Sequence, residues 1–160
     1  MSEKLTLAQF ENLLDQTCDS LRGDRDFDEF KEYVIAILFL KRLNDRFNLE
    51  RKVRRDKLVL KGFTEQQIEE DLEKREVYRM FVPEIARWNK LREQKEDLGD
   101  YLMKTFAEID RMNRGCMGVL NTVDFNKTME NGRKFLSDED LVQLIKKFEQ
   151  VILSDDYLAF

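Results

Sequence analysis

The residues of this sequence that could do chemistry are a run of cations between Lys41 and Lys57. This stretch holds eight basic residues against three acids, whereas the whole chain of 160 residues carries a net charge of −5. A basic patch on an otherwise acidic domain raises the local affinity for phosphate groups. We therefore identify a candidate nucleic-acid-binding set, which comprises Lys41, Arg42, Arg46, Arg51, Lys52, Arg54 and Arg55.

A solvated helix surface would explain the same charges without a nucleic acid. Oppositely charged residues four positions apart on a helix form ion pairs. Three such pairs are available, namely Lys41 with Asp45, Arg46 with Glu50, and Lys52 with Asp56. Arg51, Arg54 and Arg55 have no acid four residues further on, so we expect them to be the least neutralised cations and to contact phosphate. The charges alone leave both interpretations open.

Three aspartates at alternate positions resemble the ligands of a calcium loop. Asp24, Asp26 and Asp28 have that spacing, but Glu29 stands where the loop needs glycine and Ile35 where it needs the closing glutamate. Acids that enter a helix favour its dipole and cap its first turn. We expect Asp26 or Asp28 to be a helix cap and expect no calcium site.

The residues needed for catalysis are missing. The chain has no histidine, and so lacks the commonest general base, the usual partner of a Ser or Cys nucleophile and the commonest transition-metal ligand. None of its six glycines forms a GxGxxG or GxxxxGK[ST] motif. Cys18 and Cys116 lie in unrelated contexts, which predicts neither a disulfide framework nor a metal clip. We expect no catalytic, cofactor-binding or metal site.

The chain also lacks signals for export or membrane insertion. Its longest apolar run, Tyr33 to Leu40, has eight residues, far fewer than the roughly 20 that a membrane-spanning helix needs. The N-terminal residues contain no apolar segment leading to a cleavage site. We expect a cytoplasmic protein with no membrane contact.

Capping residues and apolar spacing in the sequence predict the helices that carry the basic stretch. Thr6 and Gln9 have capping-box spacing and open a helix that Gly23 ends. The next helix is apolar nearly all round over 30–40, which predicts a central place in the core. We expect it to pass Phe47 into the basic stretch and to break up before 57–60. A short strand or hairpin is compatible with 57–62 and 78–82.

Helices also dominate the second half of the sequence. The expected segments are one opened by Thr64 and Gln67, one begun by Pro83 that carries Ala86, Trp88 and Leu91, one over 97–112 with its exit at 113–118, and one opened by Ser137 and Asp140 with apolar spacing to Ile152. Trp88 is expected to be buried at the edge of the core. Together these patterns predict one compact, all-α domain of several helices.

Several segments resemble a known family in order and in residue type. They are 21–23, 27–34 and 38–47, then Tyr78, 81–84 and 86–88, then Asp110, Asn113, 118–119, 124–125 and 141–148. This series is similar to the N-terminal region of the modification (methyltransferase) subunit of type I restriction-modification enzymes. The resemblance covers nearly the whole chain, to about Leu153.

The resemblance implies a subunit that methylates adenine N6 in DNA with S-adenosylmethionine. It also implies a helical N-terminal domain that helps to close the assembly around DNA. The implied partners are DNA, a specificity subunit, a second methyltransferase subunit and the restriction subunit. The catalytic motif [DN]-P-P-[FYW] needs two adjacent prolines, and this chain has only Pro83.

We therefore expect residues 1–160 to be the N-terminal domain of a longer methyltransferase subunit, without its catalytic domain. The expected function is a non-catalytic, DNA-proximal assembly domain. The alternative is a helical protein-interaction module with no nucleic-acid role.

Overall fold

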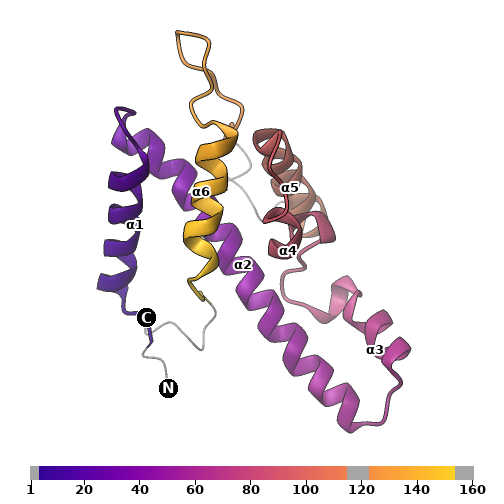
Figure 1. The fold of residues 1–160 in the computed structure, drawn as a ribbon. Coiled ribbons are helices and arrows are strands. Elements are labelled where there is room, and N and C mark those ends of the chain that lie inside the picture. The colour runs from indigo at the N-terminus through magenta and orange to yellow at the C-terminus, as the bar shows by residue number, and fades with distance from the viewer. Residues whose placement is uncertain (1–3, 115–122, 154–160) are drawn as a thin grey trace.

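The computed structural model describes residues 4–114 and 123–153, and these form an all-α fold, as the sequence predicts. The α-helices are α1 (Leu7–Leu21), α2 (Phe27–Leu60), α3 (Glu65–Leu72), α4 (Trp88–Leu91), α5 (Leu98–Met112) and α6 (Asp138–Glu149). Two short 3-10 helices, η1 (Arg75–Val77) and η2 (Glu84–Ala86), lie between α3 and α4. Figure 1 shows α1, α6 and α5 gathered around the first half of α2.

Helix α2 is the centre of the core. Its first half buries a wide face that includes Phe30, Val34, Ile37 and Leu40, each with no exposed surface, whereas Ile35 on the opposite side is 41% exposed. Asp26 caps the helix, because its carboxylate accepts a hydrogen bond from the N–H of Glu29 at 2.9 Å. The sequence-based expectation of a central buried helix is confirmed.

Three helices begin where their capping boxes predict. In each of them a hydroxyl accepts from the N–H three residues on, and that residue's side chain accepts from the cap's own N–H. The pairs are Thr6 with Gln9, Thr64 with Gln67, and Ser137 with Asp140. Helix α6 ends at Glu149, before Ile152, which is exposed.

The expected break before 57–60 is wrong. Helix α2 continues to Leu60 and ends where Gly62 adopts a left-handed φ of +83°. Leu58 is buried against Ile68 and Leu72 of α3, so the apolar run packs as a helix and forms no strand. Nor do residues 78–82 form a strand, because the N–H and carbonyl of Phe81 bond to the side-chain amide of Asn113.

The expected helix after Pro83 is split at Arg87 into η2 and α4. Arg87 is extended, with ψ 136°. The side chain of Asn44 bonds to the carbonyl of Ala86 and to the N–H of Trp88, each at 3.0 Å or less. These bonds replace the helical ones and fix the break.

Apart from Phe47, which belongs to the main core, the second half of α2 leaves that core and, with α3, forms a projecting arm, residues 46–74 (Figure 1). Its small core of Leu58, Ile68 and Leu72 is separate from the main cluster. The arm carries most of the basic stretch. The predicted exit at 113–118 lies partly outside the described residues, and Cys116 lies wholly outside them.

Candidate nucleic-acid interface

Lys41 and Arg42 lie in the body of the domain, where they hold the segment that follows α6. The Lys41 ammonium donates to both carboxylate oxygens of Asp45 at 2.7 Å and also to the carbonyl of Val151. Arg42 donates to the carbonyl of Leu153. Because the Lys41 side chain is only 5% exposed, it is not available to a phosphate in this conformation.

Three of the four arginines of the arm, Arg51, Arg54 and Arg55, pair with acids of α3 or with Glu73, the residue after α3. Arg51 contacts Glu73 at 2.9 Å and Glu69 at 3.5 Å. Arg54 makes two hydrogen bonds to the carboxylate of Asp71. Arg55 bonds to Glu65 at 2.7 Å and also to Glu69.

The expectation that Arg51, Arg54 and Arg55 are the least neutralised cations is therefore wrong. Their acids are not one helical turn away but 10 to 22 residues further along the chain. The turn at Gly62 brings α3 back beside α2, so the pairs form between helices. Whether these arginines contact DNA stays a prediction.

The ion pairs lower the pKa of two acids of the arm, Asp71 and Glu73. The hydrogen bond from Arg54 holds the pKa of the Asp71 carboxyl below its ordinary value. Hydrogen bonds from Arg87 and then Arg51 lower the pKa of Glu73 in the same way. Asp71 and Glu73 are therefore carboxylates at neutral pH.

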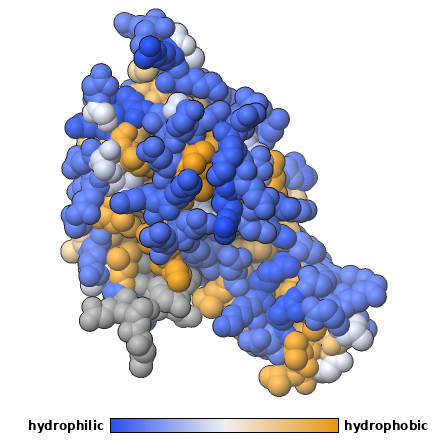
Figure 2. All heavy atoms as spheres, in the orientation of Figure 1, coloured by the Kyte–Doolittle hydropathy of each residue, from blue (hydrophilic) through white to orange (hydrophobic). Residues whose placement is uncertain are grey.

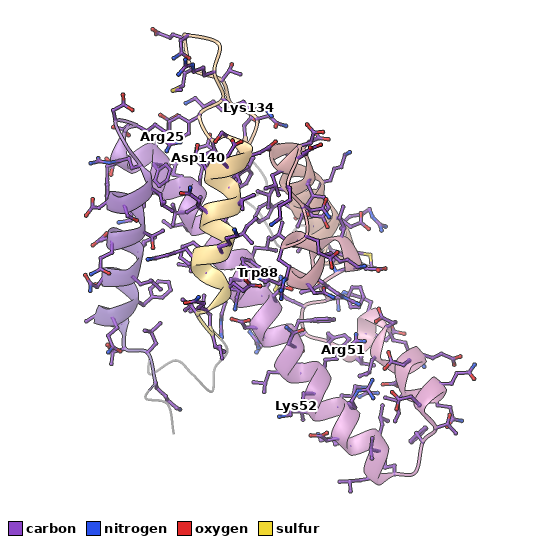
Figure 3. The ribbon with its side chains drawn as sticks, in the orientation of Figure 1. Arg25, Arg51, Lys52, Trp88, Lys134 and Asp140 are labelled. Atoms are coloured by element: carbon purple, nitrogen blue, oxygen red, sulfur yellow. The ribbon has the colours of Figure 1, made fainter. Side chains whose placement is uncertain are left out.

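Lys52 differs from its arginine neighbours. It is exposed and has no ion pair among the described residues, so the expected pair with Asp56 does not form there. The other two expected pairs do form, Lys41 with Asp45 at 2.7 Å and Arg46 with Glu50 at 3.4 Å. Figure 3 shows Arg51 on the side of α2 that faces α3, and Lys52 on the far side.

The net charge of the arm is small. Residues 46–74 hold eight basic and seven acidic side chains, a balance of +1. Electrostatic attraction to nucleic acid must therefore come from the cations that lack a partner and face solvent, and not from the whole arm. Lys52 is the member of the candidate set that meets this description.

A second group of cations, which the sequence analysis missed, lies on the loop before α6. The main chain turns back at 128–134, with one antiparallel bridge between Thr128 and Lys134 and a φ of +81° at Gly132. Arg133 and Lys134 are exposed at this turn, which projects beyond the helices (Figure 3). The turn dipeptide Asn131-Gly132 beside two cations was the available signal.

The potentially reactive groups of the described residues have structural roles. Asp26 caps α2, as expected of the acidic cluster. Burial raises the pKa of the Cys18 thiol, which keeps it protonated and unreactive at neutral pH. No described set of three or more His, Cys, Asp or Glu side chains could hold a metal ion.

No helix in the described ranges is long and apolar enough to cross a membrane.

The fold is a helical body with a projecting, ion-paired arm, and comparison with known families identifies the domain. The family model of the HsdM N-terminal domain matches residues 10–148, so the chain belongs to this family. It is accordingly part of a methyltransferase subunit of a type I restriction-modification system. The resemblance seen in the sequence is confirmed. No curated protein matches the chain.

Proposed function

We propose that this domain is non-catalytic, lies beside DNA and helps to assemble the methyltransferase. In this proposal the parent subunit transfers a methyl group from S-adenosylmethionine to adenine N6, and its catalytic domain lies outside these 160 residues. The partners are the specificity subunit, a second methyltransferase subunit and the restriction subunit, and the assembly works in the cytoplasm. Family membership supports the setting.

The observation that carries the DNA-proximal role is the arm. Helix α2 has 34 residues, which makes it roughly 50 Å long at a rise of 1.5 Å per residue. Its projecting half is stiffened by α3 through a small apolar core and the pairs of Arg51, Arg54 and Arg55. A stiff projection can reach along a duplex while the body contacts other subunits.

On this arm Lys52 is the first phosphate contact that we propose. It is exposed and unpaired within the described ranges, so binding a phosphate breaks no ion pair. Arg51, Arg54 and Arg55 contribute only if phosphate replaces their carboxylate partners. Phosphate contacts hold a protein on the duplex without reading its bases, which suits a domain whose partner subunit reads the sequence.

A protein-interaction role without DNA is the second candidate. The observation that favours it is the pairing of the three arginines with Glu65, Glu69, Asp71 and Glu73. Paired cations attract phosphate weakly, and the arm is then a scaffold for another protein.

A binding experiment with the isolated 160-residue chain separates the two candidates. Two labelled duplexes of unrelated sequence are titrated at low salt with the wild-type chain, Lys52→Gln and Lys147→Gln. Lys147 is an exposed lysine of α6 and gives the same change of charge away from the arm. We expect equal, salt-sensitive binding to both duplexes that Lys52→Gln weakens more than Lys147→Gln. Undetectable binding to both duplexes would favour the protein-interaction role.

A further inference from the structure

The outer face of the arm carries an apolar stripe that α3 does not cover. Leu49, Val53 and Leu60 lie at intervals of four and seven residues on α2, and so they share one helical face, on which the exposed Asp56 lies between Val53 and Leu60. Val53 is 46% exposed and Leu60 is 88% exposed. Val59 and Phe63 extend the apolar surface around the tip of the arm, where Figure 2 shows hydrophobic side chains gathered at its lower end.

The upper part of this stripe lies in a groove. The groove has a volume of about 460 Å³, and Leu49, Val53 and Val77 supply its apolar lining. Val77 comes from η1, so the groove has one wall from α2 and one from the segment after α3. Exposed apolar residues gathered into one patch mark an interaction site more often than scattered ones do.

The rim of the groove has an excess of positive charge. Its charged residues are Glu50, Arg54, Lys57 and Arg79. Glu50 pairs with Arg46 and Arg54 with Asp71, whereas Lys57 and Arg79 are exposed and have no ion pair among the described residues. Two uncompensated cations thus flank the apolar lining.

We infer that this groove docks an amphipathic helix of a partner protein, with apolar residues on one face and acidic residues beside them. The inference rests on the proposed assembly role and adds the chemistry of one partner surface. The apolar side chains of the partner helix fill the groove as in helix–helix packing. The acidic side chains of the partner helix pair with Lys57 and Arg79. This is the groove mode of helix recognition.

Two other occupants fit the groove less well. A duplex could bring phosphates to Lys57 and Arg79, but Val53 and Leu60 offer nothing to a phosphate. A second copy of this chain, joined through the same face by a two-fold axis, would bring like charges together at the rim. Both remain outcomes of the experiment.

The probe is a labelled synthetic helix with leucines at i, i+4, i+7 and i+11 and glutamates beside them. A matched peptide carries lysines in place of the glutamates. Fluorescence anisotropy with the 160-residue chain should show saturable binding of the glutamate peptide and none of the lysine peptide. Equal binding of both peptides, or no saturable binding of the glutamate peptide, would overturn the inference.

Variants locate the binding. Val53→Asp should weaken the affinity for the glutamate peptide by about tenfold or more, which corresponds to about 1.4 kcal/mol of binding free energy. Leu7→Asp, at a site on α1 that is 49% exposed, is the matched control and should not change the affinity. If thermal melting shows that Val53→Asp is unfolded, Val53→Ser replaces it, with a loss of a few-fold expected. An affinity that neither Val53 variant alters contradicts the docking site.

The same variants separate this inference from the DNA contact. Val53→Ser should leave duplex binding unchanged, and Lys52→Gln should leave peptide binding unchanged. If the peptide binds but Lys52→Gln has no effect on DNA, the DNA contact fails and the docking site stands. If Lys52→Gln weakens DNA binding while the peptide does not bind, the docking site alone fails. Light scattering tests whether the chain self-associates. Self-association that Val53→Asp abolishes would mean that the groove holds a second copy of this chain and not a partner helix.

Discussion

The side-chain oxygen of Asn44 accepts a hydrogen bond from the main-chain N–H of Trp88 at 2.7 Å. The amide nitrogen of Asn44 donates to the carbonyls of Leu40 and Ala86, both at 3.0 Å. Asn44 is 1% exposed, so these bonds form away from water. One buried amide on α2 therefore fixes the place where η2 ends and α4 begins.

Replacing Asn44 with alanine should destabilise the domain by about 1–3 kcal/mol, because buried main-chain groups lose their partners. The measurement is the urea midpoint. Asn48→Ala, one turn further along α2 at an exposed position, is the control and should stay within about 0.5 kcal/mol of wild type. A midpoint for Asn44→Ala that matches the control would show that water replaces the amide.

Trp88 is buried, as the sequence analysis predicts, with 8% of its surface exposed. Its ring also faces the Lys41 ammonium, 5.7 Å from the ring centroid. Trp88→Ala should cost roughly 3–5 kcal/mol by leaving a large cavity. Chemical denaturation followed by circular dichroism measures this, since the variant loses the chain's single tryptophan fluorophore. A cost below that of Asn44→Ala would show that the surrounding helices close the cavity.

The ion pair and hydrogen bonds of Asp140 predict that the stability of the domain depends on pH. Burial by itself raises the pKa of this carboxyl, but hydrogen bonds from Arg25 and Ser137 outweigh burial and hold the pKa below its ordinary value. Arg25 Nη1 lies 2.8 Å from Asp140 Oδ2. A folded pKa below the unfolded value of about 3.9 means that the carboxylate stabilises the fold above about pH 4. This stabilisation is lost as the pH falls through the folded pKa.

Asp140→Asn should therefore be less stable than wild type by about 1–2 kcal/mol at neutral pH. The gap should begin to shrink below about pH 4 and should close once the pH has fallen through the lowered pKa of folded wild type, where wild type also loses the charge. Thermal melts of both proteins across a pH series measure the gap. A gap that stays constant down to about pH 3 would assign the loss to the altered helix cap instead.

The isolated chain should bind no S-adenosylmethionine and should methylate no DNA. The sequence has neither the paired prolines of the catalytic motif nor a glycine-rich cofactor loop. Titration calorimetry with the cofactor should give no heat beyond dilution. A saturable isotherm at micromolar cofactor would contradict the non-catalytic role.

Local sequence signals predict most of the fold. The pair Thr64 and Gln67 sets the start of α3, because a capping box depends only on residues three apart. The wide buried face of 30–40, which includes Phe30, Val34 and Ile37, follows from the apolar side chains around this part of the helix. Contacts between distant segments are not encoded in such patterns. Leu58 lies in a helix because Ile68 and Leu72 cover it, and nothing within 57–60 indicates this.

The candidate site shows the same limit more clearly. Counting charges four residues apart finds the pair of Arg46 and Glu50. It cannot find the pair of Arg51 and Glu73, which are 22 residues apart and meet only because the chain turns at Gly62. Arg51, Arg54 and Arg55 are therefore paired in the structure although the spacing of charges left them without partners. Lys52, expected to be paired, is exposed and unpaired within the described ranges.

The salt dependence of DNA binding by the assembled methyltransferase tests the DNA-proximal role most directly. Lys52→Gln, Lys147→Gln and the triple variant Arg51→Gln, Arg54→Gln and Arg55→Gln are reconstituted with the specificity subunit. Affinity is measured over a salt series for target and non-target duplexes, and folding is checked by thermal melting. The triple variant also loses the ion pairs to α3, so its melt decides whether its affinity can be interpreted.

Lys52→Gln should weaken target and non-target binding about equally, because phosphate contacts do not read bases. It should also flatten the slope of log affinity against log salt by about one unit, since one phosphate contact is lost. Lys147→Gln should leave both quantities unchanged. An affinity and a slope for Lys52→Gln equal to those of wild type, with the melt intact, would contradict a DNA contact by the arm.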